Sequence, residues 1–110
     1  MLKILTAVLA LATFLGAAPA IAQTAEFTLV IQDHRFTPAE LRVPANKRIR
    51  LVIENRDATP EEFESHSLKI EKVIPGKAKG TVNFGPVKPG RYEFVGEFNE
   101  KTAKGVLIAD

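Results

Sequence analysis

Short alternating segments separated by frequent turns limit this sequence to few folds. Within residues 48–54, Ile49, Leu51 and Ile53 occupy one face and mostly charged side chains occupy the other. A period of two is typical of a half-buried β-strand. No window after residue 22 sustains the 3.6-residue period of an amphipathic helix. The sequence therefore predicts an all-β protein.

Prolines and glycines divide the rest of the chain into further strands. Pro38 and Pro44 bound one short strand, because proline has no N–H to donate to a β-ladder. Pro75-Gly76 and Lys88-Pro89-Gly90 indicate turns, and residues 55–65 are predicted to form a long polar loop. The predicted strands cover residues 26–31, 41–43, 48–54, 67–72, 81–84, 91–95 and 105–109. About seven short strands at this spacing predict a Greek-key β-sandwich.

The first 22 residues have the pattern of a secretory signal peptide. Lys3 precedes an apolar run over residues 4–16, and Ala20-Ile21-Ala22 is an A-x-A cleavage signal. The run is shorter than the roughly 20 residues that a membrane-spanning helix needs. We therefore expect removal of residues 1–22 and export of residues 23–110 as one domain, located in the periplasm.

Composition excludes several classes of function. The sequence has no cysteine, which excludes disulfides, a thiolate nucleophile and a cysteine metal ligand. Its 15 Lys and Arg residues are interspersed with 13 Asp and Glu residues, unlike the basic face of a nucleic-acid-binding protein. No glycine-rich phosphate loop and no serine with a recognisable catalytic histidine and acid are present. The sequence therefore gives no support to a hydrolase or a nucleotide-binding protein.

The order of several motifs resembles that of a cupredoxin. These motifs are residues 34–38 (HRFTP), the strand that ends at Asn55, His66 before the next strand, and residues 89–94 (PGRYEF). The resemblance covers nearly all of residues 23–110 and implies a cupredoxin-like sandwich.

The same resemblance implies that the usual copper ligands are missing. In copper-carrying cupredoxins, the Tyr-x-Phe strand is followed by a cysteine, a histidine and usually a methionine ligand. Here those positions hold Gly96, Asn99 and approximately Lys104, and only His66, at the first-ligand position, remains. A type 1 blue copper site needs a thiolate and two imidazoles, so we expect no such site.

Residues 60–65 and 96–98 resemble the cysteine-free, periplasmic cupredoxin-like partners of bacterial iron-uptake permeases. This resemblance implies a metal-binding protein that handles copper or iron during metal import. An inner-membrane iron permease or another periplasmic metal carrier is the implied partner. Two alternatives stay open: a copper-dependent ferrous-iron oxidase component, and a metal-free structural or interaction module.

Loops at one end of the predicted sandwich carry the candidate metal ligands His34, Glu64, His66 and Glu97. Two imidazoles with carboxylates suit Cu(II), Fe(II), Mn(II) or Zn(II). The alternative interpretation of His34 is a surface histidine.

Two further expectations concern the same end of the sandwich. Glu61 and Glu62 follow a proline and are predicted to form a solvated acidic turn. Simple alternation of strands from residue 67 to residue 95 would place Glu97 at the opposite end, so one extra crossing is required. Residues 73–77 are the predicted crossing.

Overall fold

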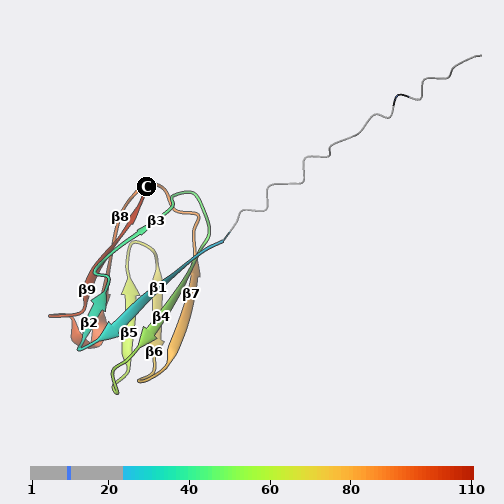
Figure 1. Cartoon of the computed structure of the whole chain (residues 1–110). Coiled ribbons are helices and arrows are strands. Elements are labelled where there is room, and N and C mark those ends of the chain that lie inside the picture. The colour runs from blue at the N-terminus through green and yellow to red at the C-terminus, as the bar shows by residue number, and fades with distance from the viewer. Residues whose placement is uncertain (1–9, 11–23) are drawn as a thin grey trace, which may run out of the picture.

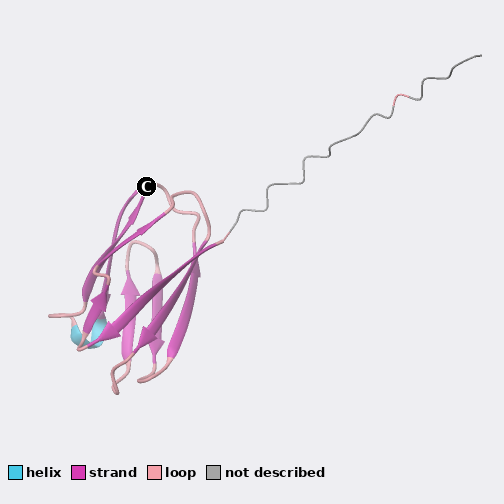
Figure 2. Ribbon diagram, in the orientation of Figure 1, coloured by secondary structure: helices cyan, strands magenta, loops and turns pink. Residues whose placement is uncertain are grey.

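The computed structural model describes Ala10 and residues 24–110, so the predicted signal peptide lies outside the described residues apart from Ala10. Strands dominate the described part of the chain (Figures 1 and 2). The elements are β1 (Ala25–Gln32), β2 (Arg35–Thr37), β3 (Glu40–Val43), β4 (Ile49–Asn55), β5 (Glu61–Ser65), β6 (Ile70–Ile74), β7 (Lys79–Phe84), β8 (Gly90–Gly96), the 3-10 helix η1 (Glu97–Asn99) and β9 (Lys104–Ala109). Within residues 24–110, no helix has the length and hydropathy needed to cross a membrane.

The strands form two sheets that face each other. One sheet has the order β2-β1-β4-β7 and the other β3-β9-β8-β5-β6. β1 pairs in parallel with β4, β3 pairs in parallel with β9, and the remaining pairs are antiparallel. This arrangement confirms the predicted all-β sandwich.

The described residues contain nine strands instead of about seven. One addition comes from a tight hairpin, in which Asp33 and His34 both have φ of 54° and connect β1 to β2. Positive φ at both central residues is typical of a type I′ turn, which matches the twist of paired strands. The predicted strands did not include the short strand β2 that follows this turn.

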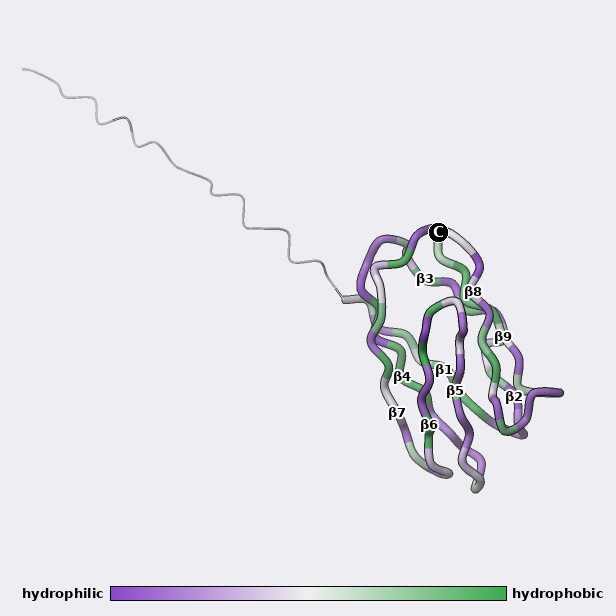
Figure 3. Tube along the Cα trace, turned by 180° about the vertical axis from the view of Figure 1, so that it is seen from behind, coloured by the Kyte–Doolittle hydropathy of each residue, from purple (hydrophilic) through white to green (hydrophobic). Residues whose placement is uncertain are grey.

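The second addition is β5, which lies in the segment predicted to be a loop. Its inward positions are Glu61, Phe63 and Ser65, each no more than 1% exposed, and only one of them is apolar. The hydrophobic alternation of a strand is therefore hidden in the sequence, and β5 is largely hydrophilic along its length (Figure 3). The predicted strand over residues 67–72 is wrong in its first part, where residues 66–69 form a turn.

β5 also supplies the extra crossing that the site prediction required. The chain crosses the sandwich on β5, returns on β6, and turns over residues 75–78 before β7. The proposed crossing by residues 73–77 is wrong, because residue 74 ends β6 and the following residues form that turn. The β1–β2 turn, the β4–β5 loop, the β6–β7 turn and η1 consequently lie at one end, which we call the η1 pole (lower end in Figure 1).

Apolar side chains from both sheets fill the core. Ile49, Leu51 and Ile53 are fully buried, as their alternation predicted. Phe36 packs edge-on against Phe63 and Phe94, with ring centroids 6.0 and 5.0 Å away. Edge-to-face contact of this kind adds to the stabilisation that burial of the rings provides.

Tyr92 is half-buried beside this core, and its hydroxyl donates a hydrogen bond to the Lys88 carbonyl at 2.7 Å. A tyrosine that bonds to the backbone a few residues upstream resembles the tyrosine corner of Greek-key sandwiches. The bond secures the chain where β8 begins.

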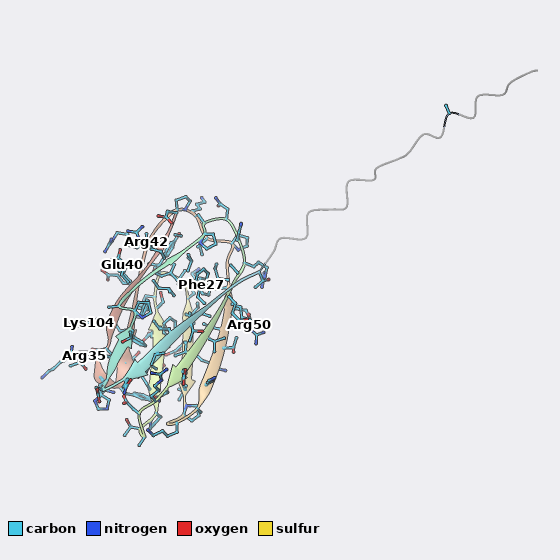
Figure 4. All side chains as sticks on the ribbon, viewed as in Figure 1. Phe27, Arg35, Glu40, Arg42, Arg50 and Lys104 are labelled. Carbon is cyan, nitrogen blue, oxygen red and sulfur yellow. The ribbon has the colours of Figure 1, made fainter. Side chains whose placement is uncertain are left out.

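Exposed ion pairs lie on the strands away from the η1 pole. Arg42 contacts Glu40 at 3.3 Å and Asp110 at 2.9 Å, and Arg50 contacts Glu26 at 3.4 Å. Figure 4 shows Glu40 and Arg42 together on one side of the molecule and Arg50 on the other. Exposed pairs of this kind contribute little to stability.

Asn55, at the end of β4, joins three segments of the η1 pole. Its Nδ2 donates to the carbonyl oxygens of Thr59 and Ile74 at 2.8 and 3.2 Å, and its Oδ1 accepts from the Asp57 N–H at 3.0 Å. The side chain is 1% exposed, so water cannot replace these bonds. Asn55 therefore holds the β4–β5 loop against the β6–β7 turn.

We predict that Asn55→Ala lowers the free energy of unfolding by about 2 kcal/mol or more, because buried backbone groups lose their partners. Urea denaturation followed by circular dichroism measures the change. Asn83→Ala, at an exposed position of β7, is the control and should change it little. Equal stability of the two variants would contradict this role of Asn55.

Candidate metal site

A buried carboxylate lies against Gly96 and Asn99, two of the positions where the cupredoxin resemblance places copper ligands. Glu61 is 1% exposed. Its Oε2 accepts a hydrogen bond from Asn99 Nδ2 at 2.7 Å, and its Oε1 accepts from the Phe98 N–H at 2.9 Å and the Glu62 N–H at 3.0 Å. We call this arrangement the Glu61 clamp. The prediction that Glu61 lies in a solvated turn is wrong, because these donors satisfy a carboxylate that β5 directs inward.

The residues of the clamp do not fit a type 1 copper ion. A Cβ atom built at Gly96 would lie 2.6 Å from Glu61 Cδ and 2.6 Å from Ala103 Cβ, so a cysteine has no room there. The residue facing Gly96 and Asn99 is Glu61 and not His66. With the carboxylate fully hydrogen-bonded and no thiolate in the sequence, the donor set that blue copper requires is missing.

A second group of acidic side chains lies on the outer face of the five-stranded sheet. Glu62 and Glu64 point outward from β5, Glu71 is paired with Glu64 on β6, and Glu97 begins η1. One carboxylate oxygen of each residue lies within 4.8 Å of the others. We call these four residues the acidic cluster.

Repulsion within the acidic cluster changes how one member titrates. A side-chain hydrogen bond with Glu71 raises the pKa of the Glu62 carboxyl above its ordinary value. Desolvation and repulsion from Glu71, Glu64 and Glu61 raise this pKa further. Two carboxyl groups that share a proton avoid placing like charges side by side. A cation bound between these oxygens would remove the same repulsion.

The structure brings together three of the four predicted ligands. Glu64 and Glu97 belong to the acidic cluster, and His66 Nε2 lies 3.4 Å from Glu64 Oε1. The His66 side chain is 89% exposed and the Glu64 side chain 15% exposed. His66 therefore lies largely in solvent beside the cluster, whereas Glu64 is mostly covered by protein.

His34 lies apart from the acidic cluster. It lines a hollow at the η1 pole with Glu97, but its Nε2 lies 3.4 Å from Thr59 Oγ1. Its backbone N–H donates to Asp57 Oδ2 at 3.0 Å. Hydrogen bonds from the His34 and Asp33 backbones lower the pKa of the Asp57 carboxyl, although burial opposes this. Asp57 thus holds the hairpin turn that carries His34.

Glu62 and Glu71 are the members of the acidic cluster that sequence reasoning missed. The signal for Glu62 was present, because residues at i and i+2 of a strand share a face and Glu62 and Glu64 have that spacing. Glu62 was instead assigned to a solvated acidic turn, because residues 55–65 were predicted to form a loop, and its position in β5 shows that this assignment is wrong. The contribution of Glu71 depends on its pairing with Glu64, which the sequence did not indicate.

Comparison with known proteins supports the architecture described above. The family model described as "Cupredoxin-like domain" matches residues 4–109. The chain belongs to the cupredoxin-like domain family. An uncharacterized protein of Rickettsia prowazekii (strain Madrid E) is 42% identical to this cupredoxin-like domain over 85 residues, which is 77% of this chain and 68% of that protein.

Solved structures with the same fold include copper proteins. Auracyanin A, a "blue" copper protein from Chloroflexus aurantiacus, superposes with a TM-score of 0.68 at 12% identity, over 80% of this chain and 100% of that chain. The metal-binding domain of the Cu(I)-exporting P-type ATPase CopA of Streptococcus pneumoniae has a TM-score of 0.64 at 16% identity, over 79% and 86% of the two chains. At these identities the likeness shows the fold alone.

We predict that Gly96→Ala lowers the free energy of unfolding by about 1–3 kcal/mol, because the added methyl group overlaps the Ala103 and Glu61 side chains. Gly90→Ala is the matched control, since a Cβ there meets the Tyr92 ring at an ordinary 3.6 Å. Denaturant unfolding compares the two variants. A smaller loss at Gly96 than at Gly90 would show that the clamp tolerates a side chain.

The raised pKa of Glu62 predicts how stability depends on pH. The folded protein holds this proton more tightly than the unfolded chain, so its contribution to stability is complete below the unfolded pKa and is lost as pH rises through the folded pKa. Glu71→Gln removes the main cause of this pKa shift. The variant should therefore lose less stability than the wild-type protein between acid pH and pH 7. Unfolding measured between pH 4 and pH 7 tests this, and a wild-type-like slope would contradict it.

Proposed function

We propose that this cupredoxin-like domain is a periplasmic protein that binds a copper or iron ion at the acidic cluster and serves a metal-import system. The observation that carries the proposal is the convergence of Glu62, Glu64, Glu71 and Glu97 within 4.8 Å. Four like charges are costly to hold together unless protons or a cation neutralise them. β-sheet pairing on one side and η1 on the other keep them in place.

The donor atoms define which ions suit this site. Carboxylate oxygens favour Cu(II), Fe(II) or Mn(II) over Cu(I), which prefers sulfur. His66, 3.4 Å from Glu64, would add an imidazole nitrogen and favour Cu(II) further. His34 is the outlying member of the proposed set, because it lines the hollow beside Glu97 without joining the cluster.

Accessibility of the ion supports a role in delivery. Glu71 and Glu97 are exposed, so a second protein could reach an ion held there. An inner-membrane iron permease or another periplasmic carrier is the proposed recipient, on the strength of residues 60–65 and 96–98 and of the signal-peptide pattern. A ferrous-iron oxidase component is less favoured, since an oxygen-rich site stabilises Cu(II) and opposes its cycling to Cu(I).

The Glu61 clamp favours a second candidate, a metal-free interaction module. In that case the fold would retain the cupredoxin scaffold, the copper position would be closed by protein groups, and the acidic face would bind a partner directly. The two candidates differ in whether the purified protein binds an ion.

We expect calorimetry to show saturable binding of Cu(II) or Mn(II), and Glu64→Gln and Glu97→Gln to weaken it at least tenfold, about 1.4 kcal/mol. Each lost carboxylate must be replaced by water at the ion. Binding should also weaken toward acid pH, because the Glu62 carboxyl with its raised pKa takes up a proton that competes with the ion. His66→Ala and His34→Ala report separately whether either imidazole contributes.

Glu40→Gln is the control, because it removes the same charge from β3, which is the edge strand opposite β6 in the five-stranded sheet. Equal affinity of the cluster variants and this control would place the ion elsewhere. Absence of binding by the parent protein would favour the interaction module. Oxygen consumption with Fe(II) and the copper-loaded protein tests the oxidase alternative.

A further inference from the structure

Hydrogen bonds attach η1 to the sandwich in place of buried apolar side chains. η1 contains no buried residue, and its N-cap residue Gly96 offers no side-chain hydrogen bond. The exposed fraction of Phe98 is 52%, so the helix is not held by an apolar anchor. What does hold it is Glu61, through the Phe98 N–H and the Asn99 amide.

Asn99 continues this connection into the next strand. Its carbonyl oxygen accepts from the Ala103 N–H at 2.8 Å, and the Ala103 carbonyl accepts from the Gly96 N–H at 2.8 Å. The β8–β9 connection is therefore closed on itself by backbone bonds. Beyond the strand pair of Gly96 with Phe63, the Glu61 carboxylate ties it to β5. Glu61 accepts all three of its hydrogen bonds from N–H donors, two of them in η1.

We propose that Glu61 and Asn99 are positioning residues that fix η1 and thereby set the place of Glu97 in the acidic cluster. Glu61 and Glu62 are neighbours on β5, and their side chains point to opposite faces of the sheet. Phe98 and Glu97 are likewise neighbours in η1. Fastening the Phe98 N–H to the inward carboxylate places Glu97 next to the outward one. The clamp opposes the repulsion that would otherwise separate η1 from β5.

Two variants test the clamp in the full-length protein. Asn99→Leu removes the amide donor and keeps the branched shape of the side chain, and Glu61→Gln keeps the shape but replaces an acceptor oxygen with a donor. In both, we expect the Phe98 amide proton to exchange at least about tenfold faster by NMR, which corresponds to the loss of one buried hydrogen bond. The nuclear Overhauser contacts between the Glu62 and Glu97 side chains should also weaken.

The effect on metal binding rests on the proposed function. Affinity for Cu(II) should fall about tenfold in both clamp variants. Val82→Ala, which removes core volume away from the clamp, is the control for general destabilisation and should keep both the Phe98 protection and the affinity. Glu97→Gln should lose affinity while keeping the Phe98 protection, because it removes a ligand and leaves the clamp intact.

The outcomes separate the two proposals. Unchanged Phe98 exchange in Asn99→Leu would overturn the clamp. Faster exchange with unchanged contacts between Glu62 and Glu97 would overturn its positioning role. If the parent binds no Cu(II), the proposed function fails, and the exchange and the Glu62–Glu97 contacts still decide the inference.

Discussion

The hydrogen bonds of the Glu61 carboxylate organise the η1 pole. A buried carboxylate is tolerated only when protein donors replace the water it has lost, and here the Phe98, Glu62 and Asn99 donors do so. Those donors come from β5 and from η1, which contains no buried residue. The same bonds involve Asn99 and lie against Gly96, two positions where the resemblance places copper ligands, and by our proposal they also set the place of Glu97 on the outer face. The Glu61 clamp on the inner face and the acidic cluster on the outer face therefore depend on the same hydrogen bonds.

Strand periodicity predicted most of the fold, and failed where polar residues are buried. β4 and β8 were recognisable because their inward residues are apolar. β5 was missed because Glu61 and Ser65 are buried through hydrogen bonds, the latter by donating from Oγ to the Glu93 carbonyl at 2.7 Å. Such partners lie far away in the sequence, so local patterns do not reveal them.

The same limitation shaped the prediction of the site. Glu64, His66 and Glu97 were selected from their expected loops, and the structure places them near one another. His34 was selected with them because the β1–β2 turn lies at the same pole, but the turn directs it toward Thr59. Glu71 joins the cluster through the register of β6 against β5, which is a tertiary property. The ligand role of each residue remains a prediction.

The parallel pairing of β3 with β9 has a consequence for how the chain reaches its folded state. Glu40 pairs with Val106 and Val43 with Ala109, so the five-stranded sheet cannot be completed until residues 104–109 have been synthesised. The backbone groups along one edge of β1 likewise remain unpaired until β4 has been synthesised. Contacts between such distant residues slow folding. A chain of this topology stays incompletely folded for longer during synthesis, which leaves its unpaired strand edges accessible to chaperones that bind unfolded segments.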